Sequence, residues 1–117
     1  MNNKRLTGDL YESRAVTYLM EQGIEVIDRN VYTKRGEIDI IAKEQEYLCF
    51  IEVKYRSSTK CGMPADAVTN HKRRNIYEAA RVYLYKNHIS YDTPCRFDVI
   101  AILGTQIHYI RNAYGGL

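Results

Sequence analysis

Two short β-branched segments with charges at alternate positions constrain the fold of this chain more than any other feature. Residues 36–41 and 50–54 both have the composition of β-strands. The short polar stretch between them predicts a hairpin whose turn is centred on residues 45–46. In that register Asp39 lies directly opposite Glu52, with Cβ atoms about 4.5–5.5 Å apart.

The opposed carboxylates of Asp39 and Glu52 predict a site for a divalent cation. Two like charges this close destabilise a sheet unless a cation lies between them, and Mg²⁺ prefers one or two carboxylates together with water and phosphate oxygens. We expect the two acids to hold one or two Mg²⁺ or Mn²⁺ ions that bind a scissile phosphate. Lys54 shares the face of Glu52 and would orient the attacking water or stabilise charge on the phosphate. The main-chain carbonyl of Val53 is a further expected ligand.

Asp39 and Glu52 also have a non-functional interpretation, in which they lie on the solvated outer face of an antiparallel sheet. The face of Glu52 also carries Leu48 and Phe50, however. A face that is apolar at one end and charged at the other is typical of a half-buried cleft, which favours the functional interpretation.

A helical acid, Glu12, joins this set. The first predicted helix has Thr7 as its N-cap and stops at Gly23. Its apolar positions recur at helical spacing: Leu10, Ala15, Val16, Leu19 and Met20. Glu12 lies on or at the edge of that apolar face, so its carboxylate needs a partner. The alternative is a glutamate of the first turns, favoured by the helix dipole with its tip in water.

The remaining pattern predicts helix, three strands, helix and two strands. The expected segments are a strand at 24–31, the hairpin at 37–54, a loop at 55–70, a helix to about residue 87, strands at 97–103 and 106–110, and a frayed tail at 112–117. The long connection after the hairpin predicts a right-handed parallel crossover. We therefore expect one α/β domain over residues 1–117, with a mixed central sheet of about five strands flanked by helices.

Composition excludes several classes of function. No apolar run in the 117 residues approaches the ~18–20 needed to span a bilayer, and the polar N-terminus argues against secretion. Three cysteines without CxxC or CxxH spacing argue against a zinc site and for a reducing, cytoplasmic compartment. The net charge of +3 permits nucleic-acid binding without requiring it.

Basic side chains near the predicted site are candidates for phosphate binding. They are Arg35 before the hairpin, Arg56 and Lys60 in the loop, and Lys72, Arg73 and Arg74 at the start of the second helix. The alternative for the helical group is a solvated face.

Several motifs of this chain resemble the YraN-like proteins, small bacterial proteins grouped with restriction-endonuclease-like nucleases and similar in pattern to archaeal Holliday junction resolvases. The resemblance rests on residues 8–12, 29–31, 35–41 and 50–54, Arg56, residues 67–69, Lys72, Arg73, and residues 79–81 and 96–99. It covers the chain to about residue 110.

The resemblance implies a PD-(D/E)XK fold in which Asp39, Glu52 and Lys54 form the core motif and Glu12 is the helical acid beside the metal. The chain departs from the pattern at Ile38, where the motif has proline, and at Tyr11, where a glycine is expected. Neither departure removes an expected ligand.

Two functions follow from these patterns. The favoured one is a Mg²⁺- or Mn²⁺-dependent DNA endonuclease acting on branched DNA such as Holliday junctions, as a homodimer if two strands are cut symmetrically. The alternative is a module that keeps the nuclease fold and binds nucleic acid or a protein partner without cleaving.

Overall fold

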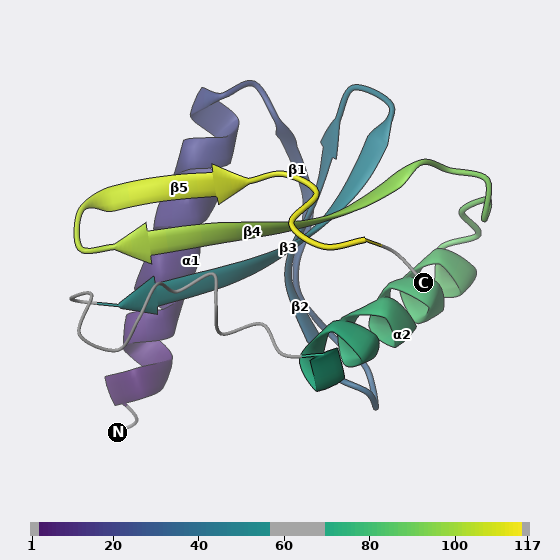
Figure 1. Cartoon of the computed structure of the whole chain (residues 1–117), viewed down its shortest axis with the longest axis horizontal. Helices are drawn as coiled ribbons and strands as arrows, with labels where there is room; N and C mark the ends of the chain where they lie inside the picture. The colour runs from purple at the N-terminus through teal and green to yellow at the C-terminus, as the bar shows by residue number, and fades with distance from the viewer. Residues whose placement is uncertain (1–2, 57–69, 116–117) are drawn as a thin grey trace.

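The structure has the predicted order of helix, three strands, helix and two strands (Figure 1). A computed structural model describes residues 3–56 and 70–115. The elements are α1 (Asn3–Glu21), β1 (Glu25–Tyr32), β2 (Glu37–Glu44), β3 (Tyr47–Arg56), α2 (Asn70–Lys86), β4 (Cys95–Leu103) and β5 (Gln106–Ile110). Most of the segment predicted as a loop, 57–69, lies outside the described residues.

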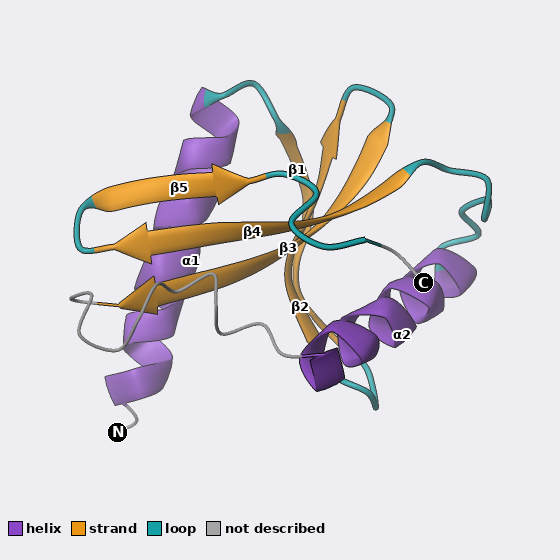
Figure 2. Cartoon of the chain, viewed as in Figure 1, coloured by secondary structure: helices purple, strands orange, loops and turns teal. Residues whose placement is uncertain are grey.

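The five strands form one mixed sheet in the order β1-β2-β3-β4-β5. Strands β3 and β4 are parallel, and every other neighbouring pair is antiparallel. The chain passes from β3 to β4 by way of α2, as the predicted crossover requires. Figure 2 shows the two helices on opposite sides of the strands. The predicted fold class, one α/β domain with a mixed five-stranded sheet flanked by helices, is confirmed.

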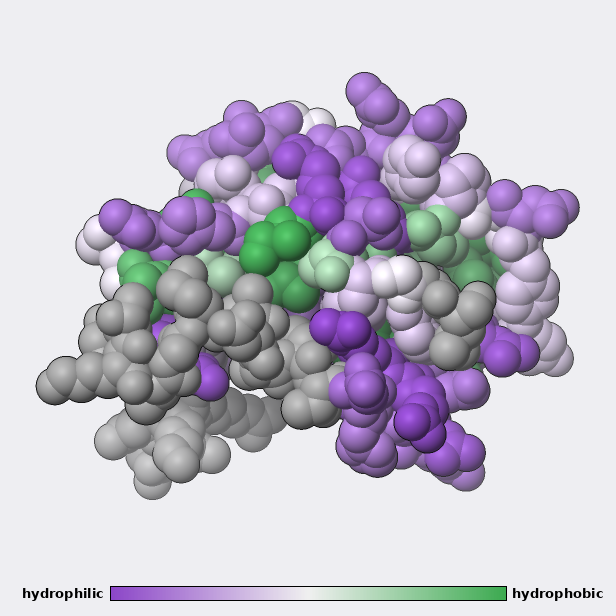
Figure 3. Space-filling view, in the orientation of Figure 1, coloured by the Kyte–Doolittle hydropathy of each residue, from purple (hydrophilic) through white to green (hydrophobic). Residues whose placement is uncertain are grey.

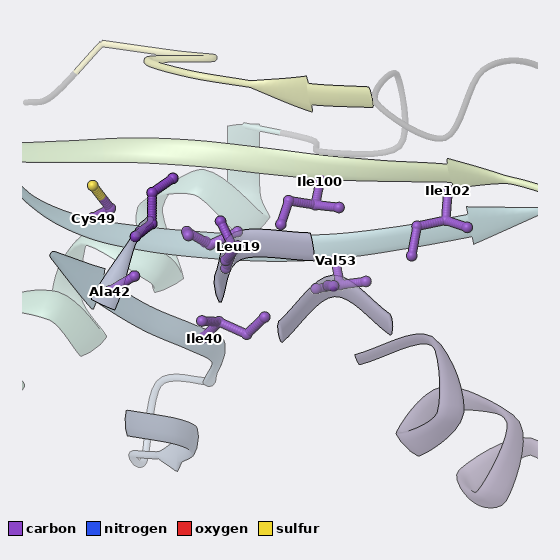
Figure 4. Close-up of a cluster of buried hydrophobic side chains, with 10 residues drawn as sticks. Leu19, Ile40, Ala42, Cys49, Val53, Ile100 and Ile102 are labelled. Carbon is purple, nitrogen blue, oxygen red and sulfur yellow. The ribbon is translucent and has the colours of Figure 1, made fainter. Parts of the chain in front are cut away.

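Helix α1 covers one face of the sheet through Ala15 and Leu19, both fully buried. They pack on the strand side chains drawn in Figure 4, which include Ile40, Ala42, Cys49, Val53, Ile100 and Ile102. The predicted apolar stripe is wrong at Leu10 and Met20, which are 61% and 65% exposed. Tyr11, Ala15 and Leu19 are spaced four residues apart and share one face, whereas Leu10 and Met20 each lie one position, about 100°, beyond it.

Helix α2 covers the opposite face. Its buried side chains recur at helical spacing: Ile76, Tyr77, Ala79, Ala80, Tyr83 and Leu84. Phe50 of β3 lies under this helix and meets the Tyr83 ring edge to face, with centroids 6.2 Å apart. Because neighbouring β3 side chains alternate, Phe50 faces α2 while Cys49 faces α1.

Two predicted chain boundaries are corrected. Helix α1 begins at Asn3, so Thr7 lies within the helix and is not its N-cap. Several residues of this segment are of types that favour the N-cap position, and residue type alone does not identify which of them starts the helix. Gly23 does end the helix, at φ +79°. The tail is not frayed at Tyr114, which is buried against Phe97 and Tyr77.

The buried acid Asp98 of β4 has a structural role. Its carboxylate accepts hydrogen bonds from the Arg96 guanidinium, from the Tyr109 hydroxyl and from the backbone N–H of Asn112. Arg96 also bonds Glu44 at 2.7 Å. Asp98 forms an ion pair with Arg96, two residues earlier on the same strand. This network stabilises the domain through saturated hydrogen bonding of a buried charge.

Candidate active site

Strands β2 and β3 separate at the end of their hairpin opposite the turn. The predicted register is confirmed from Glu44–Tyr47 to Ile40–Ile51, where their pairing ends. Beyond that point β2 remains paired with β1, and β3 remains paired with β4. The sheet therefore forks between its second and third strands.

Asp39 lies at this fork. The expected ladder pair of Asp39 with Glu52 is not formed, because the strands have already parted. Instead the backbone N–H of Val53, which would face β2 in a continued ladder, donates to Asp39 Oδ2 at 2.8 Å. One carboxylate oxygen thus replaces a backbone acceptor, and the site is built into the opening of the sheet.

The fork opens into a cleft of about 330 Å³. Its lining residues come from α1, β2, β3 and α2: Gly8, Glu12, Glu37, Asp39, Glu52, Val53, Lys54, Tyr55 and Lys72. All residues predicted as catalytic or metal-binding from the sequence line this one cleft. Because α1 and α2 cover opposite faces of the sheet, their side chains share a cleft only where the sheet opens.

Three carboxylates meet on the α1 side of the cleft. Glu12, Glu37 and Asp39 each place an oxygen so that the three atoms lie within 4.8 Å of one another. The side-chain amide of Asn30, in the orientation that satisfies its hydrogen bonds, donates to Glu37 Oε1 at 3.0 Å and to Glu12 Oε1 at 2.7 Å. Asn30 has φ +52°, a left-handed conformation that aims its amide at the acids.

Crowding and burial raise the pKa of every acid in this trio. Burial, followed by the charge of Glu52, raises the pKa of Asp39 to about 8. Burial and the charge of Glu37 raise the pKa of Glu12, and burial and the charge of Glu52 raise that of Glu37. Such shifts mark a site whose carboxylates lack enough positive charge.

Glu52 faces α2 and forms ion pairs with two lysines, Lys72 of α2 and Lys54 of its own strand. Its side chain is 6% exposed, and its Oε1 lies 3.0 Å from Lys72 Nζ and 3.7 Å from Lys54 Nζ. Its Oε2 is buried without a hydrogen-bond partner among the described residues. Burial and the neighbouring Lys72 lower the pKa of Lys54, whereas Lys72, although burial opposes it, has its pKa raised by Glu52 and Lys54.

The basic residues predicted to bind phosphate differ in their exposure and contacts. Arg35 and Arg74 are exposed, and hydrophilic side chains cover the N-terminal part of α2, right of centre in the lower part of Figure 3. Lys72 turns into the cleft. The guanidinium of Arg73 stacks on the Tyr114 ring, 4.9 Å from the centroid, and its part in phosphate binding stays a prediction.

The other two predicted phosphate ligands are Arg56 and Lys60. Arg56 bonds the backbone oxygen of its neighbour Tyr55. Lys60 lies outside the described residues.

Two residues of the site, Glu37 in the cleft and Asn30 beside its acids, were not predicted from sequence. Glu37 stands two positions before Asp39 and shares its face by strand alternation. Asn30 carried no local signal, because its contact depends on a left-handed residue in β1. At the departure noted above, Tyr11 stacks on Tyr55 with ring centroids 4.2 Å apart, so it packs against the cleft wall.

Comparison with known proteins assigns the chain to a family. The sequence profile of UPF0102, described as an uncharacterised protein family, matches residues 11–102. The chain belongs to the UPF0102 family.

Relatives in this family match over nearly their whole length. A UPF0102 protein of Lachnoclostridium phytofermentans is 45% identical over 96% of this chain and 95% of its own. One from Clostridioides difficile is 44% identical over 97% and 100%, and one from Vibrio parahaemolyticus is 42% identical over 95% and 93%. The YraN-like resemblance is thereby confirmed at the level of the family. Among the described helices of this UPF0102 member, none is both long and apolar enough to cross a membrane.

Proposed function

We propose that this UPF0102 protein is a divalent-metal-dependent endonuclease that hydrolyses phosphodiester bonds in DNA. The observation that carries the proposal is the cleft at the fork, where four carboxylates and two lysines meet within about 330 Å³. Carboxylate oxygens of this number and crowding suit Mg²⁺ or Mn²⁺. The orphaned Oε2 of Glu52 and the raised pKa of Asp39 both fit a site completed by a cation.

Each side chain has a role that its position supports. A cation bound by the carboxylates of Asp39, Glu12 and Glu52, with the Val53 carbonyl as a further ligand, would polarise the phosphate and acidify a bound water. Lys54, half-buried and with its pKa lowered, stands beside Glu52 to hold that water or to stabilise charge on the phosphate. Lys72 adds a second positive charge in the same cleft.

Exposed basic residues beside the cleft favour nucleic acid as the substrate class. A second hollow of about 310 Å³ is lined by Arg35, His71, Lys72 and Glu37 among others, and it shares Glu37 and Lys72 with the cleft. Arg35 and Arg74 would contact phosphates flanking the scissile bond. Symmetric cutting of a branched substrate would require a homodimer, which size-exclusion chromatography with light scattering tests.

Cleavage of labelled DNA tests this proposal. A four-way junction, linear duplex and single strand are incubated with protein in Mg²⁺, Mn²⁺ or EDTA, beside the variants Glu52→Gln and Lys54→Met. The matched control is Lys43→Met, which removes the same charge from an exposed position of β2. We expect metal-dependent cutting that both site variants lose and the control keeps.

The opposite result would identify the binding module. Retained DNA binding without cutting under any metal condition refutes the nuclease and favours a non-catalytic member of the same fold. Cutting that survives in EDTA or in Glu52→Gln points to a contaminating enzyme.

A further inference from the structure

We infer that Glu37 is a ligand of the divalent cation and that Asn30 positions it. Glu37 and Asn30 enter neither the core motif nor its helical acid. The inference rests on the proposed function for its choice of cation. It changes the expected ligand set, since the first ion would be held by Glu12, Glu37 and Asp39 on the α1 side of the cleft.

The geometry of the acids separates them into two groups. Oxygens of Glu12, Glu37 and Asp39 fall within 4.8 Å of one another, a spacing from which three ligands can converge on one ion. Glu52 is not part of that trio, and its Oε1 is bound by Lys72 at 3.0 Å. Within the described part of the chain, a cation entering this cleft would therefore find three acids that form no ion pair with a lysine on one side, and one lysine-bound acid on the other.

An independent observation points to a ligand in the same cleft. Glu52 is 5% exposed, lines the cleft, and leaves its buried Oε2 without a hydrogen-bond partner among the described residues. A buried carboxylate oxygen without a donor is costly. A hydrated cation held by the trio would supply that oxygen with a water ligand to accept from.

Asn30 fixes two members of the trio. Its amide nitrogen donates to both Glu12 and Glu37, so it holds carboxylates from α1 and β2 at a set separation. The left-handed φ of +52° at a residue other than glycine is uncommon, and Asn tolerates it best among the larger residues. Hydrogen bonds to metal-binding carboxylates orient them and tune the affinity of a site.

Titration of metal-free protein with Mn²⁺, followed by the EPR signal of free Mn²⁺, tests the assignment without DNA. The variant Glu37→Gln keeps the shape of the side chain and an oxygen that accepts from Asn30, so the site should fold. The matched control is Glu46→Gln, which makes the same chemical change in the exposed hairpin turn. Asn30→Gly removes the amide from a backbone that glycine adopts readily.

We expect Glu37→Gln and Asn30→Gly each to weaken Mn²⁺ binding by at least about tenfold, while Glu46→Gln matches the wild type. If Glu37 were purely structural, Glu37→Gln would lower the melting temperature of the metal-free protein and leave its Mn²⁺ affinity intact. We expect the reverse for Glu37→Gln in metal-free buffer, an equal or higher melting temperature, because one of three crowded negative charges is gone.

Three results overturn or separate the claims. Wild-type affinity in Glu37→Gln overturns this inference and leaves the nuclease proposal to the cleavage assay. Absence of Mn²⁺ binding in the wild type overturns the site itself. Weakened binding in Glu37→Gln together with no DNA cleavage by the wild type supports the cation site and refutes the nuclease.

Discussion

Replacing Lys72 with methionine probes how α2 and a cation share the cleft. Methionine keeps most of the aliphatic stem of lysine and removes its charge. Lys72 Nζ lies 3.0 Å from Glu52 Oε1, whereas Lys54 Nζ lies 3.7 Å away. The variant therefore leaves a buried carboxylate with only its more distant lysine, and we expect the metal-free protein to lose stability.

The size of the loss follows from distance and exposure. Two unit charges 3.0 Å apart attract by about 5 kcal/mol at an effective dielectric constant of about 20. Desolvation offsets much of this, and the side chain of Lys72 is 38% exposed. The expected loss lies between an exposed pair, under about 1 kcal/mol, and a fully buried one, about 3–5 kcal/mol. We expect about 2 kcal/mol, which lowers the melting temperature of a domain this size by about 8 °C.

Urea denaturation and thermal melting, with and without Mn²⁺, measure the effect, and Lys43→Met serves as the control of equal charge. Because Lys72 would compete with the proposed cation for Glu52, we expect millimolar Mn²⁺ to stabilise Lys72→Met more than the wild type. A double-mutant cycle with Glu52→Gln isolates the pair. A loss of unfolding free energy below about 0.5 kcal/mol in Lys72→Met would refute this reasoning. So would a difference in stability between Lys72→Met and the wild type that is the same with and without Mn²⁺.

Two further predictions concern the polar network at the other end of the sheet. Hydrogen bonds from Arg111 and Arg96 hold the pKa of Glu44 at about 2, below its ordinary 4.5, so their stabilisation is full above about pH 4.5 and lost as the pH falls toward 2. We expect Glu44→Gln to lower the free energy of unfolding by about 1 kcal/mol at pH 7 and by little at pH 2, as measured by urea denaturation. Equal losses at both pH values would contradict the contribution of the ion pair. Asp98→Asn should cost about 3 kcal/mol, because it removes the buried negative charge that lies 3.0 Å from Arg96 Nε. A urea-measured loss below about 1 kcal/mol would contradict that role.

Much of the fold could be predicted from local sequence pattern. The hairpin register followed from the placement of its turn at 45–46, where Gln45 has φ +55°. The buried face of α2 follows from helical spacing, because Ile76, Ala79, Ala80, Tyr83 and Leu84 recur along one side of the helix, with Tyr85, 73% exposed, lying off it. The α1 stripe was harder to place, since apolar residues occur on its exposed side as well, at Leu10 and Met20. Periodicity identifies a buried face only when the opposite face is polar.

The site was predicted in composition but not in arrangement. Register alone placed Asp39 opposite Glu52, as neighbours in a continuous ladder. The point at which β2 and β3 part depends on their outer partners, β1 and β4, which continue to pair with them. The hairpin sequence alone does not contain that information. The same limit applies to Arg73, whose partner Tyr114 lies far along the chain.

The fork explains why a site with both acids and lysines can exist in this small domain. In an unbroken sheet, side chains facing α1 and α2 are separated by the backbone layer, and neither helix reaches the other. Where β2 and β3 part, Asp39 turns toward the acids Glu12 and Glu37, while Glu52 turns toward Lys72. The opening thus joins an acidic half to a lysine-bearing half, the arrangement of charges that the proposed hydrolysis of a phosphodiester would use.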